Sequence, residues 1–183
     1  IKTKEIIITP QIVVDIQKRY SDISVPLDIP IPPKISFEKA KKLTELNLRS
    51  ALYSLDEKRR GDKYLLFASI QAWDYHSAYK ISKELSSHEF DGFAIGGLIP
   101  RQNNLKTICD IILGVKEGTP ENKPIHVFGI SSFKLLPLLF YLGVDSVDGS
   151  TYIQSAANKK YFVPYLTKEI DINKYQDEKL PCS

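Results

Sequence analysis

Residues 64–97 read YLLFASIQAWDYHSAYKISKELSSHEFDGFAIGG, and this stretch decides the fold class. It opens with one apolar run, Tyr64–Ile70, and closes with another, Phe93–Gly96. A helical segment, Ser77–Ser86, lies between them. A strand, a helix and a strand of these lengths predict a βαβ unit, in which both strands lie parallel in one sheet.

The same alternation continues on both sides of this unit. Further strands are predicted at Ile23–Leu27, Ile125–Gly129 and Val144–Asp148, and further helices at Pro10–Tyr20, Ser36–Leu55, Leu105–Val115 and Phe133–Leu142. Thr9 is the expected N-cap of the first helix, because proline follows it at the first helical position. The pattern predicts an α/β protein with helices packed around a parallel sheet.

Composition bounds the function without choosing it. The 183 residues suffice for one substantial core, and a net charge of +3 permits a nucleic-acid partner without indicating one. No apolar stretch approaches the roughly 20 residues of a membrane span, and two cysteines favour a cytoplasmic location over a disulfide framework. The chain starts at Ile1 and holds no methionine, so we expect it to be a piece of a longer protein.

Polar or backbone-exposing residues follow the strands where each strand ends. They are Asp28, Gln71, Gly96 with Gly97, Gly129 and Asp148. In parallel α/β proteins the chemistry lies at the carboxyl ends of the strands, so this edge is the candidate site.

Strand parity separates two nearby acids. Val144, Ser146 and Asp148 share one face, whereas Asp145 shares the other with its neighbour Val147. Asp148 is therefore expected to face the pocket, and Asp145 to serve as a capping or salt-bridging acid on the helical side. Gly149 is expected to leave room for a ligand beside Asp148.

Several motifs together resemble the tRNA-guanine transglycosylase family, especially its archaeal branch. They are VPLDIPIPP, FDGFAIGGL, HVFGISS and GVDSVDGSTY, and the resemblance extends from ITPQIVVDIQ through YFVP to the closing PCS. It implies a (β/α)8 TIM barrel with an inserted zinc-binding subdomain. Residues 1–160 would form roughly the C-terminal five βα units and residues 161–183 the start of the zinc subdomain. Five strands cannot close an eight-stranded barrel by themselves.

The resemblance also implies a reaction, in which a pentosyltransferase replaces guanine in tRNA with a 7-deazaguanine base. Asp148 matches the nucleophile that forms a covalent aspartyl-ribosyl intermediate, and a carboxylate suits that step because it is ionised at neutral pH. Asp28 matches the acid that accepts paired N–H donors of the base. The other base-binding positions are Gln71, Gly96, Gly97, Leu98, Phe128 and Gly129.

The same resemblance sets limits. The family's proton-shuttle aspartate lies upstream of this chain, so the chain alone is expected to be inactive. Cys182 would be the first ligand of a structural Zn2+, whose other ligands are not in the chain. Ala72 replaces a usual glycine and is expected to crowd or reshape the pocket, while Val147 replaces a phenylalanine. The implied partners are tRNA, a 7-deazaguanine base (7-cyano-7-deazaguanine favoured by LDIPIPP), and a second copy or partner chain, with no membrane.

Three alternatives stay open from the residues. The GISS motif after a strand could bind phosphate at a helix N-terminus, as in a lyase or isomerase, or Ser131 or Ser132 could simply cap that helix. The chain could also belong to a non-catalytic paralogue or subunit, or act on DNA. His126 is interpreted as a satisfied interior histidine, Cys109 as a core residue, and Lys159-Lys160 as a backbone contact only through the family link.

Overall fold

A computed structural model describes residues 7–58, 61–162 and 169–174. The α-helices are α1 (Pro10–Tyr20), α2 (Phe37–Glu57), α3 (Tyr75–Leu85), α4 (Leu105–Gly118), α5 (Leu136–Tyr141) and α6 (Thr151–Ala157). The strands are β1 (Ile23–Ser24), β2 (Leu65–Gln71), β3 (Gly92–Gly96), β4 (Ile125–Val127), β5 (Ser146–Val147), β6 (Lys160–Phe162) and β7 (Glu169–Asp171). Two short 3-10 helices, η1 (Ile99–Arg101) and η2 (Ile172–Lys174), complete the described elements.

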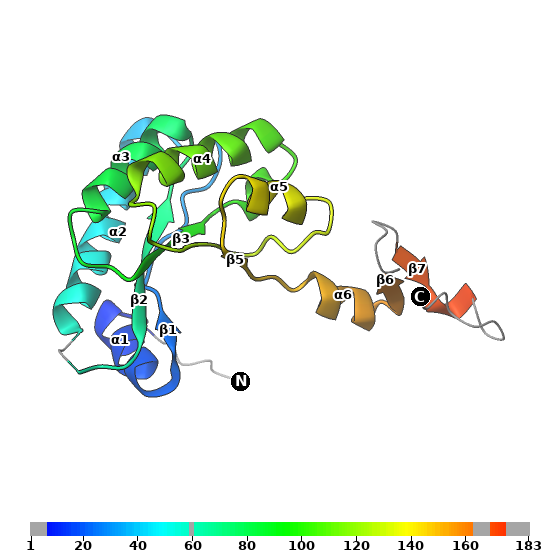
Figure 1. Ribbon diagram of the computed structural model, residues 1–183, viewed down its shortest axis with the longest axis horizontal. Helices are drawn as coiled ribbons and strands as arrows, with labels where there is room; N and C mark the ends of the chain where they lie inside the picture. The colour runs from blue at the N-terminus through cyan, green and yellow to red at the C-terminus, as the bar shows by residue number, and fades with distance from the viewer. Residues whose placement is uncertain (1–6, 59–60, 163–168, 175–183) are drawn as a thin grey trace.

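Strands β1 to β5 form one parallel sheet in sequence order. A helix follows each of the first four strands and returns the chain to the next one, so the carboxyl ends of all five strands meet at one edge (Figure 1). Within the described residues, β1 and β5 each have a single neighbour in this sheet. The prediction of five consecutive βα units, a partial TIM barrel, is confirmed.

The two faces of the sheet carry different residues, as their parity requires. Ile70, Ile95, Val127 and Val147 form a row of register partners or neighbours that packs against the helices, and the first three are fully buried. The opposite row, Ser69, Ala94, His126 and Ser146, is small or polar. We call the face that carries this second row the inner face.

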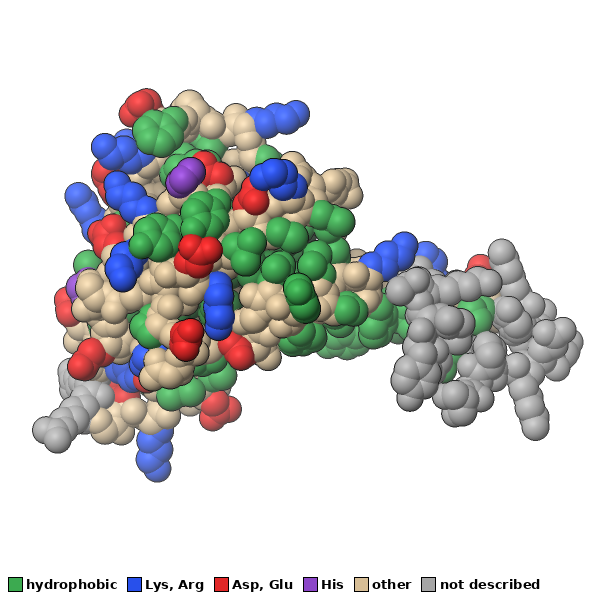
Figure 2. Space-filling model, turned by 45° about the horizontal axis from the view of Figure 1, so that its top comes forward, with side chains coloured by type: hydrophobic (Ala, Val, Ile, Leu, Met, Phe, Trp, Pro, Cys, Tyr) green, Lys and Arg blue, Asp and Glu red, His purple; other side chains and the backbone are tan. Residues whose placement is uncertain are grey.

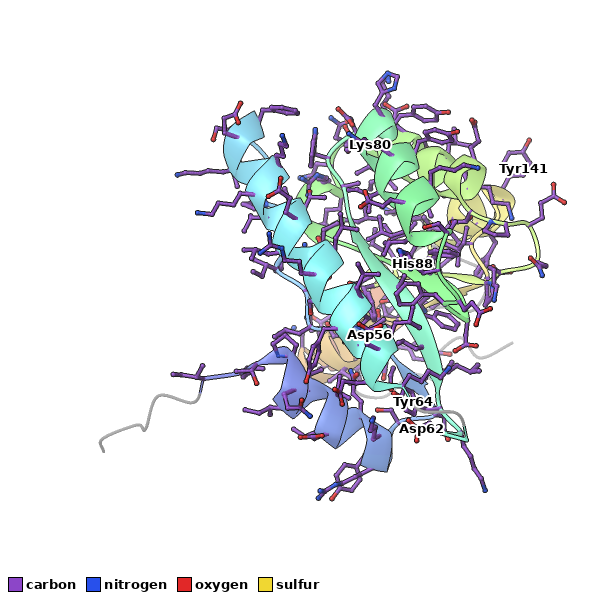
Figure 3. All side chains as sticks on the ribbon, turned by 90° about the vertical axis from the view of Figure 1, so that its left-hand side faces the viewer. Asp56, Asp62, Tyr64, Lys80, His88 and Tyr141 are labelled. Atoms are coloured by element: carbon purple, nitrogen blue, oxygen red, sulfur yellow. The ribbon has the colours of Figure 1, made fainter. Side chains whose placement is uncertain are left out.

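Helices α2, α3 and α4 lie on the helical side of the sheet. Figure 3 shows α2 and α3 in front of β2, with Asp56 near the end of α2 and Lys80 on α3. Side-chain hydrogen bonds cap the first turns of two helices, α1 and α3. Thr9 Oγ1 accepts from the Ile12 N–H at the start of α1, and Asp74 and Ser77 form a reciprocal capping box at the start of α3.

Some boundaries differ from the sequence predictions. Strand β1 is two residues long, because Pro26 follows closely and cannot donate to a ladder. Helix α5 begins only at Leu136, because Pro137 in its first turn has no N–H to continue the bond that Leu136 donates to the Ser132 carbonyl. Helix α6 was absent from the predicted elements.

Helix α6 and the antiparallel pair β6–β7 lie to one side of the sheet and its helices (Figure 1). Figure 2 shows hydrophobic side chains gathered on the side of the body that leads toward this tail. Helices α5 and α6 and the segment just before α5 carry exposed hydrophobic side chains, namely Phe133, Phe140, Tyr141, Tyr152 and Ile153. None of the helices in the described ranges is both long enough and apolar enough to span a membrane.

Candidate functional site

The predicted site residues form a second row on the inner face, at the carboxyl edge of the sheet. Gln71, Gly96, Phe128 and Asp148 each lie two residues beyond a member of the row of Ser69, Ala94, His126 and Ser146. Gln71 and Gly96 are themselves register partners. The sequence-predicted residues at the ends of β2 to β5 therefore come together at one edge, as expected from parallel strands.

Asp28 joins this row from the segment after β1. Gln71 Nε2 donates to Asp28 Oδ2 over 2.7 Å, which ties the first two strands together at the site. Burial raises the pKa of Asp28 above its ordinary value of 3.8, and the hydrogen bond from Gln71 partly offsets this effect. A partly buried carboxylate is a suitable acceptor for paired N–H donors.

Gln71 presents an acceptor of its own. Its side chain is 5% exposed, and within the described residues Oε1 has no hydrogen-bond partner. A buried amide oxygen without a donor costs free energy, so this atom is suited to an N–H or O–H of a ligand.

Gly96 and Gly97 let the amide of Gln71 approach the backbone. An added Cβ would lie 2.1 Å from Gln71 Nε2 at Gly96 and 2.5 Å from Gln71 Oε1 at Gly97, where φ is also +69°. Only glycine fits both positions. Leu98, which follows them, is fully buried in the core and supports the turn without facing the edge.

Arg101 fixes this turn relative to the proline-rich segment, a role that the sequence did not signal. Its Nη1 donates to the Gly97 carbonyl over 2.5 Å and its Nη2 to the Ile31 carbonyl over 2.9 Å. The arginine is 6% exposed and lines a cavity of about 390 Å³ with Pro32 and Trp73. The segment that carries Asp28 is therefore fastened to the turn that carries Gly97.

Asp148 stands at the other side of the edge and is open to solvent. Its Oδ1 accepts from the Gly129 N–H over 2.6 Å, and its side chain is 58% exposed. Gly129 has φ +76°, and an added Cβ would lie 2.3 Å from Ile99 Cδ1. One carboxylate oxygen is thus anchored by the backbone, and the other has no hydrogen bond to the described residues.

Asp145 has a structural partner, as the sequence predicts, at the opposite end of the sheet. Its Oδ2 accepts from the Ile125 N–H over 2.8 Å, and its own N–H donates to the Ile125 carbonyl. Asp91 makes the same pair of hydrogen bonds with Leu66 at the start of β2. Both acids cap the amino end of the preceding strand, so Asp145 contributes to the sheet and lies away from the carboxyl edge.

His126 is a residue that the sequence interpretation passed over as interior. Its Nδ1 lies 2.9 Å from Ser146 Oγ, and its Nε2 lies 3.9 Å from Asp148 Oδ1. Its ring meets Phe128 edge to face, with the ring centroids 4.6 Å apart. His126 therefore connects the two candidate residues at the ends of β4 and β5. The only signal in the sequence is its position two residues before Phe128 on the same face.

Two expectations about room at the site are wrong. Gly149 does not leave open space, because an added Cβ would lie 2.1 Å from Ser131 Oγ, so the glycine accommodates that serine. Ala72 does not crowd the edge, because it is 2% exposed in the hydrophobic core that also contains Ile70. Val147 packs partly buried against the same core, in keeping with a mild replacement.

The two readings of the GISS motif also fail. Helix α5 begins at Leu136, and no side chain caps it, so neither Ser131 nor Ser132 is its N-cap. Ser131 Oγ donates instead to Thr151 Oγ1 over 2.9 Å. Helix α5 is only six residues long and begins beyond the motif, so it gives no support to a phosphate site at the motif.

The remaining predicted positions add no contact to the candidate site among the described residues. Cys182 lies outside the described residues, and in those residues no three His, Cys, Asp or Glu side chains lie together as metal ligands. The described residues therefore do not supply a zinc site. Cys109 is a partly buried free thiol on α4. Lys159 has φ +53° at the end of α6, and Lys160 begins β6 on the exposed tail.

Comparison with known proteins identifies the relatives. The family model described as queuine tRNA-ribosyltransferase matches residues 1–183. A tRNA-guanine(15) transglycosylase of Methanocaldococcus jannaschii is 32% identical over 182 residues, covering 96% of this chain and 28% of the relative. One from Methanococcus aeolicus is 32% identical over 186 residues (98% and 28%), and one from Pyrococcus abyssi is 30% identical over 175 residues (93% and 29%). The chain spans less than a third of the length of these relatives.

Proposed function

The chain belongs to the queuine tRNA-ribosyltransferase family, and from this premise we propose that the complete protein carrying it exchanges a guanine of tRNA for a 7-deazaguanine base. The observation that carries the proposal is the row at the carboxyl edge. It pairs a partly buried carboxylate, Asp28, with the amide of Gln71, and it adds an open carboxylate, Asp148, anchored through one oxygen.

The two carboxylates divide the work. Asp28 and Gln71 accept N–H groups of the purine, and the buried setting strengthens these hydrogen bonds. Asp148 attacks C1′ of the ribose as the C1′–N9 bond breaks, and guanine leaves with the bonding electrons and takes up a proton at N9. The incoming base gives up its N9 proton as N9 attacks C1′, which breaks the bond between C1′ and Asp148 and releases the carboxylate. A carboxylate stabilises the positive charge that develops on the sugar in both steps.

The relatives' names specify guanine 15 of tRNA, and we extend that position to this protein. The motif LDIPIPP favours 7-cyano-7-deazaguanine as the incoming base. Cys182 would contribute to a structural zinc site in the complete protein.

The test is incorporation of labelled guanine into a tRNA transcript by the complete protein. We expect label in the transcript with guanine at position 15 and none when that base is adenine. A DNA oligonucleotide of the same sequence is the matched control. Preferential labelling of the DNA would show that the substrate is DNA and not tRNA. Tight tRNA binding without any incorporation would contradict the proposal and identify a non-catalytic relative.

A further inference from the structure

We propose that His126 is a positioning residue for the covalent step, because its Nε2–H is placed to donate to Asp148 Oδ1 alongside the Gly129 N–H. This inference rests on the proposed function, since it concerns how the nucleophile of that reaction is aimed. His126 lies in the inner row below the edge, so it acts through Asp148 and does not itself contact the substrate.

The first support is how His126 is held. It lies on β4 directly opposite Ser146 of β5, and its side chain is 18% exposed. Ser146 Oγ lies 2.9 Å from Nδ1, and Phe128 packs edge-on against the ring at 4.6 Å between centroids. These two contacts fix both the position and the rotation of the imidazole.

The second support is the direction of Nε2. With Nδ1 at Ser146, the opposite nitrogen points toward Asp148, and the Nε2 to Oδ1 distance is 3.9 Å. This is longer than a hydrogen bond, but Asp148 is open to solvent and its carboxylate can rotate toward the ring. Hydrogen bonds of catalytic groups are often long in the free enzyme and shorten when substrate binds.

The third support is the protonation state. Burial lowers the pKa of His126, and the neighbouring charge of Asp148 opposes this shift. A neutral ring carries one proton, and placing it on Nε2 lets Nδ1 accept from the Ser146 hydroxyl. The other tautomer would direct a lone pair at a carboxylate. The favoured tautomer is therefore the one that donates to Asp148.

The chemical consequence follows from the count of donors. Once the carboxylate turns toward the ring, Gly129 N–H and His126 Nε2–H both donate to Oδ1, which leaves Oδ2 to attack C1′. Because the ring is neutral, it orients the carboxylate without neutralising its charge, which preserves its nucleophilicity.

The test compares His126→Phe with His126→Gln in the complete protein. Phenylalanine keeps the ring against Phe128 and removes both nitrogens, whereas glutamine returns an N–H near the position of Nε2. We measure the single-turnover rate of covalent adduct formation with saturating guanine-containing tRNA. One hydrogen bond to a charged group corresponds to about a 10- to 100-fold change in rate. We expect that loss in His126→Phe, recovery to within about fivefold of the parent in His126→Gln, and unchanged tRNA affinity.

His88→Phe is the matched control, because His88 is an exposed histidine in the turn before β3, away from the carboxyl edge (Figure 3). It should form adduct at the parental rate. A parental rate in His126→Phe, or equal losses in His126→Phe and His126→Gln, would overturn the inference while the parent's adduct still supports the proposed function. No adduct from the parent would instead contradict the proposed function.

If His126→Phe does not fold, the Ser146→Ala variant provides the test. It keeps the imidazole and removes only the hydroxyl that lies beside Nδ1, so the ring proton is no longer directed to Nε2. A severalfold slower adduct is expected, and the parental rate would overturn the inference.

Discussion

Asp145 and Asp148 are three residues apart, yet their carboxylates bind opposite ends of the same strand. Asp145 accepts from the N–H of Ile125, the first residue of β4, and Asp148 accepts from the N–H of Gly129, two residues beyond its last. One acid thus caps the amino end of the sheet, and the other stands at the carboxyl edge with the base-binding candidates. Their difference in position predicts a difference in role.

Replacing Asp28 by Asn should abolish guanine exchange while the fold persists. The asparagine oxygen can still accept from Gln71, but its NH2 group then faces the N–H groups of the base, which need an acceptor. The mismatch should cost roughly 1–3 kcal/mol of binding free energy or more. Guanine affinity and thermal unfolding of the two proteins check this. Equal guanine affinity would show that Asp28 does not contact the base.

Base binding should also depend on pH through Asp28. Because burial raises the pKa of Asp28, this carboxyl takes up a proton at a higher pH than an ordinary aspartate, and the protonated form loses an acceptor. Guanine affinity should therefore fall as the pH is lowered through this raised pKa. In Asp28→Asn this decrease of guanine affinity at low pH should be absent. If the decrease persists in the variant, another titrating group causes it.

Replacing Gly96 by Ala should displace the side chain of Gln71. The new Cβ would lie 2.1 Å from Gln71 Nε2, so the amide must leave Asp28 or the strands must separate. Overpacking of this kind costs roughly 1–3 kcal/mol. Trp73, the only tryptophan, lies two residues after Gln71 and should report the change by its fluorescence. An unchanged spectrum with full guanine affinity would contradict the tight contact.

Replacing Asp91 by Ala should lower the free energy of unfolding at pH 7 by about 1–3 kcal/mol. Burial opposes ionisation of Asp91, but the Leu66 N–H and the Lys58 ammonium hold its pKa below 3.8. The native contribution is therefore present above that value and is lost as the pH falls through the lowered pKa. Urea unfolding of parent and variant should show a difference that shrinks on acidification. A difference independent of pH would mean that the charge of Asp91 does not contribute.

Much of this arrangement could be predicted from the sequence. The alternation of side chains along a strand predicted that Asp148 lies on the inner face and Val147 on the helical side. The order of βα units predicted that Gln71, Gly96 and Phe128 lie at one edge. These follow from the period of two along a strand and from the common direction of parallel strands.

Contacts between segments that are distant in sequence could not be predicted from the sequence. No local pattern reveals that Arg101 binds the carbonyl of Ile31, or that Ser131 occupies the space beside Gly149. His126 was passed over because the register of β4 with β5 decides its neighbours, and register is a property of the folded sheet.

The most direct test of the account is covalent trapping of guanine-containing tRNA on Asp148→Asn and Asp145→Asn variants of the complete protein. The asparagine at 148 keeps the shape of the side chain, so folding and tRNA binding should persist, but a neutral amide is a poor nucleophile and cannot offset the charge on the sugar. The account predicts, under denaturing conditions, a protein–RNA adduct from the parent and from Asp145→Asn, and none from Asp148→Asn. An adduct that survives in Asp148→Asn and disappears in Asp145→Asn would contradict it.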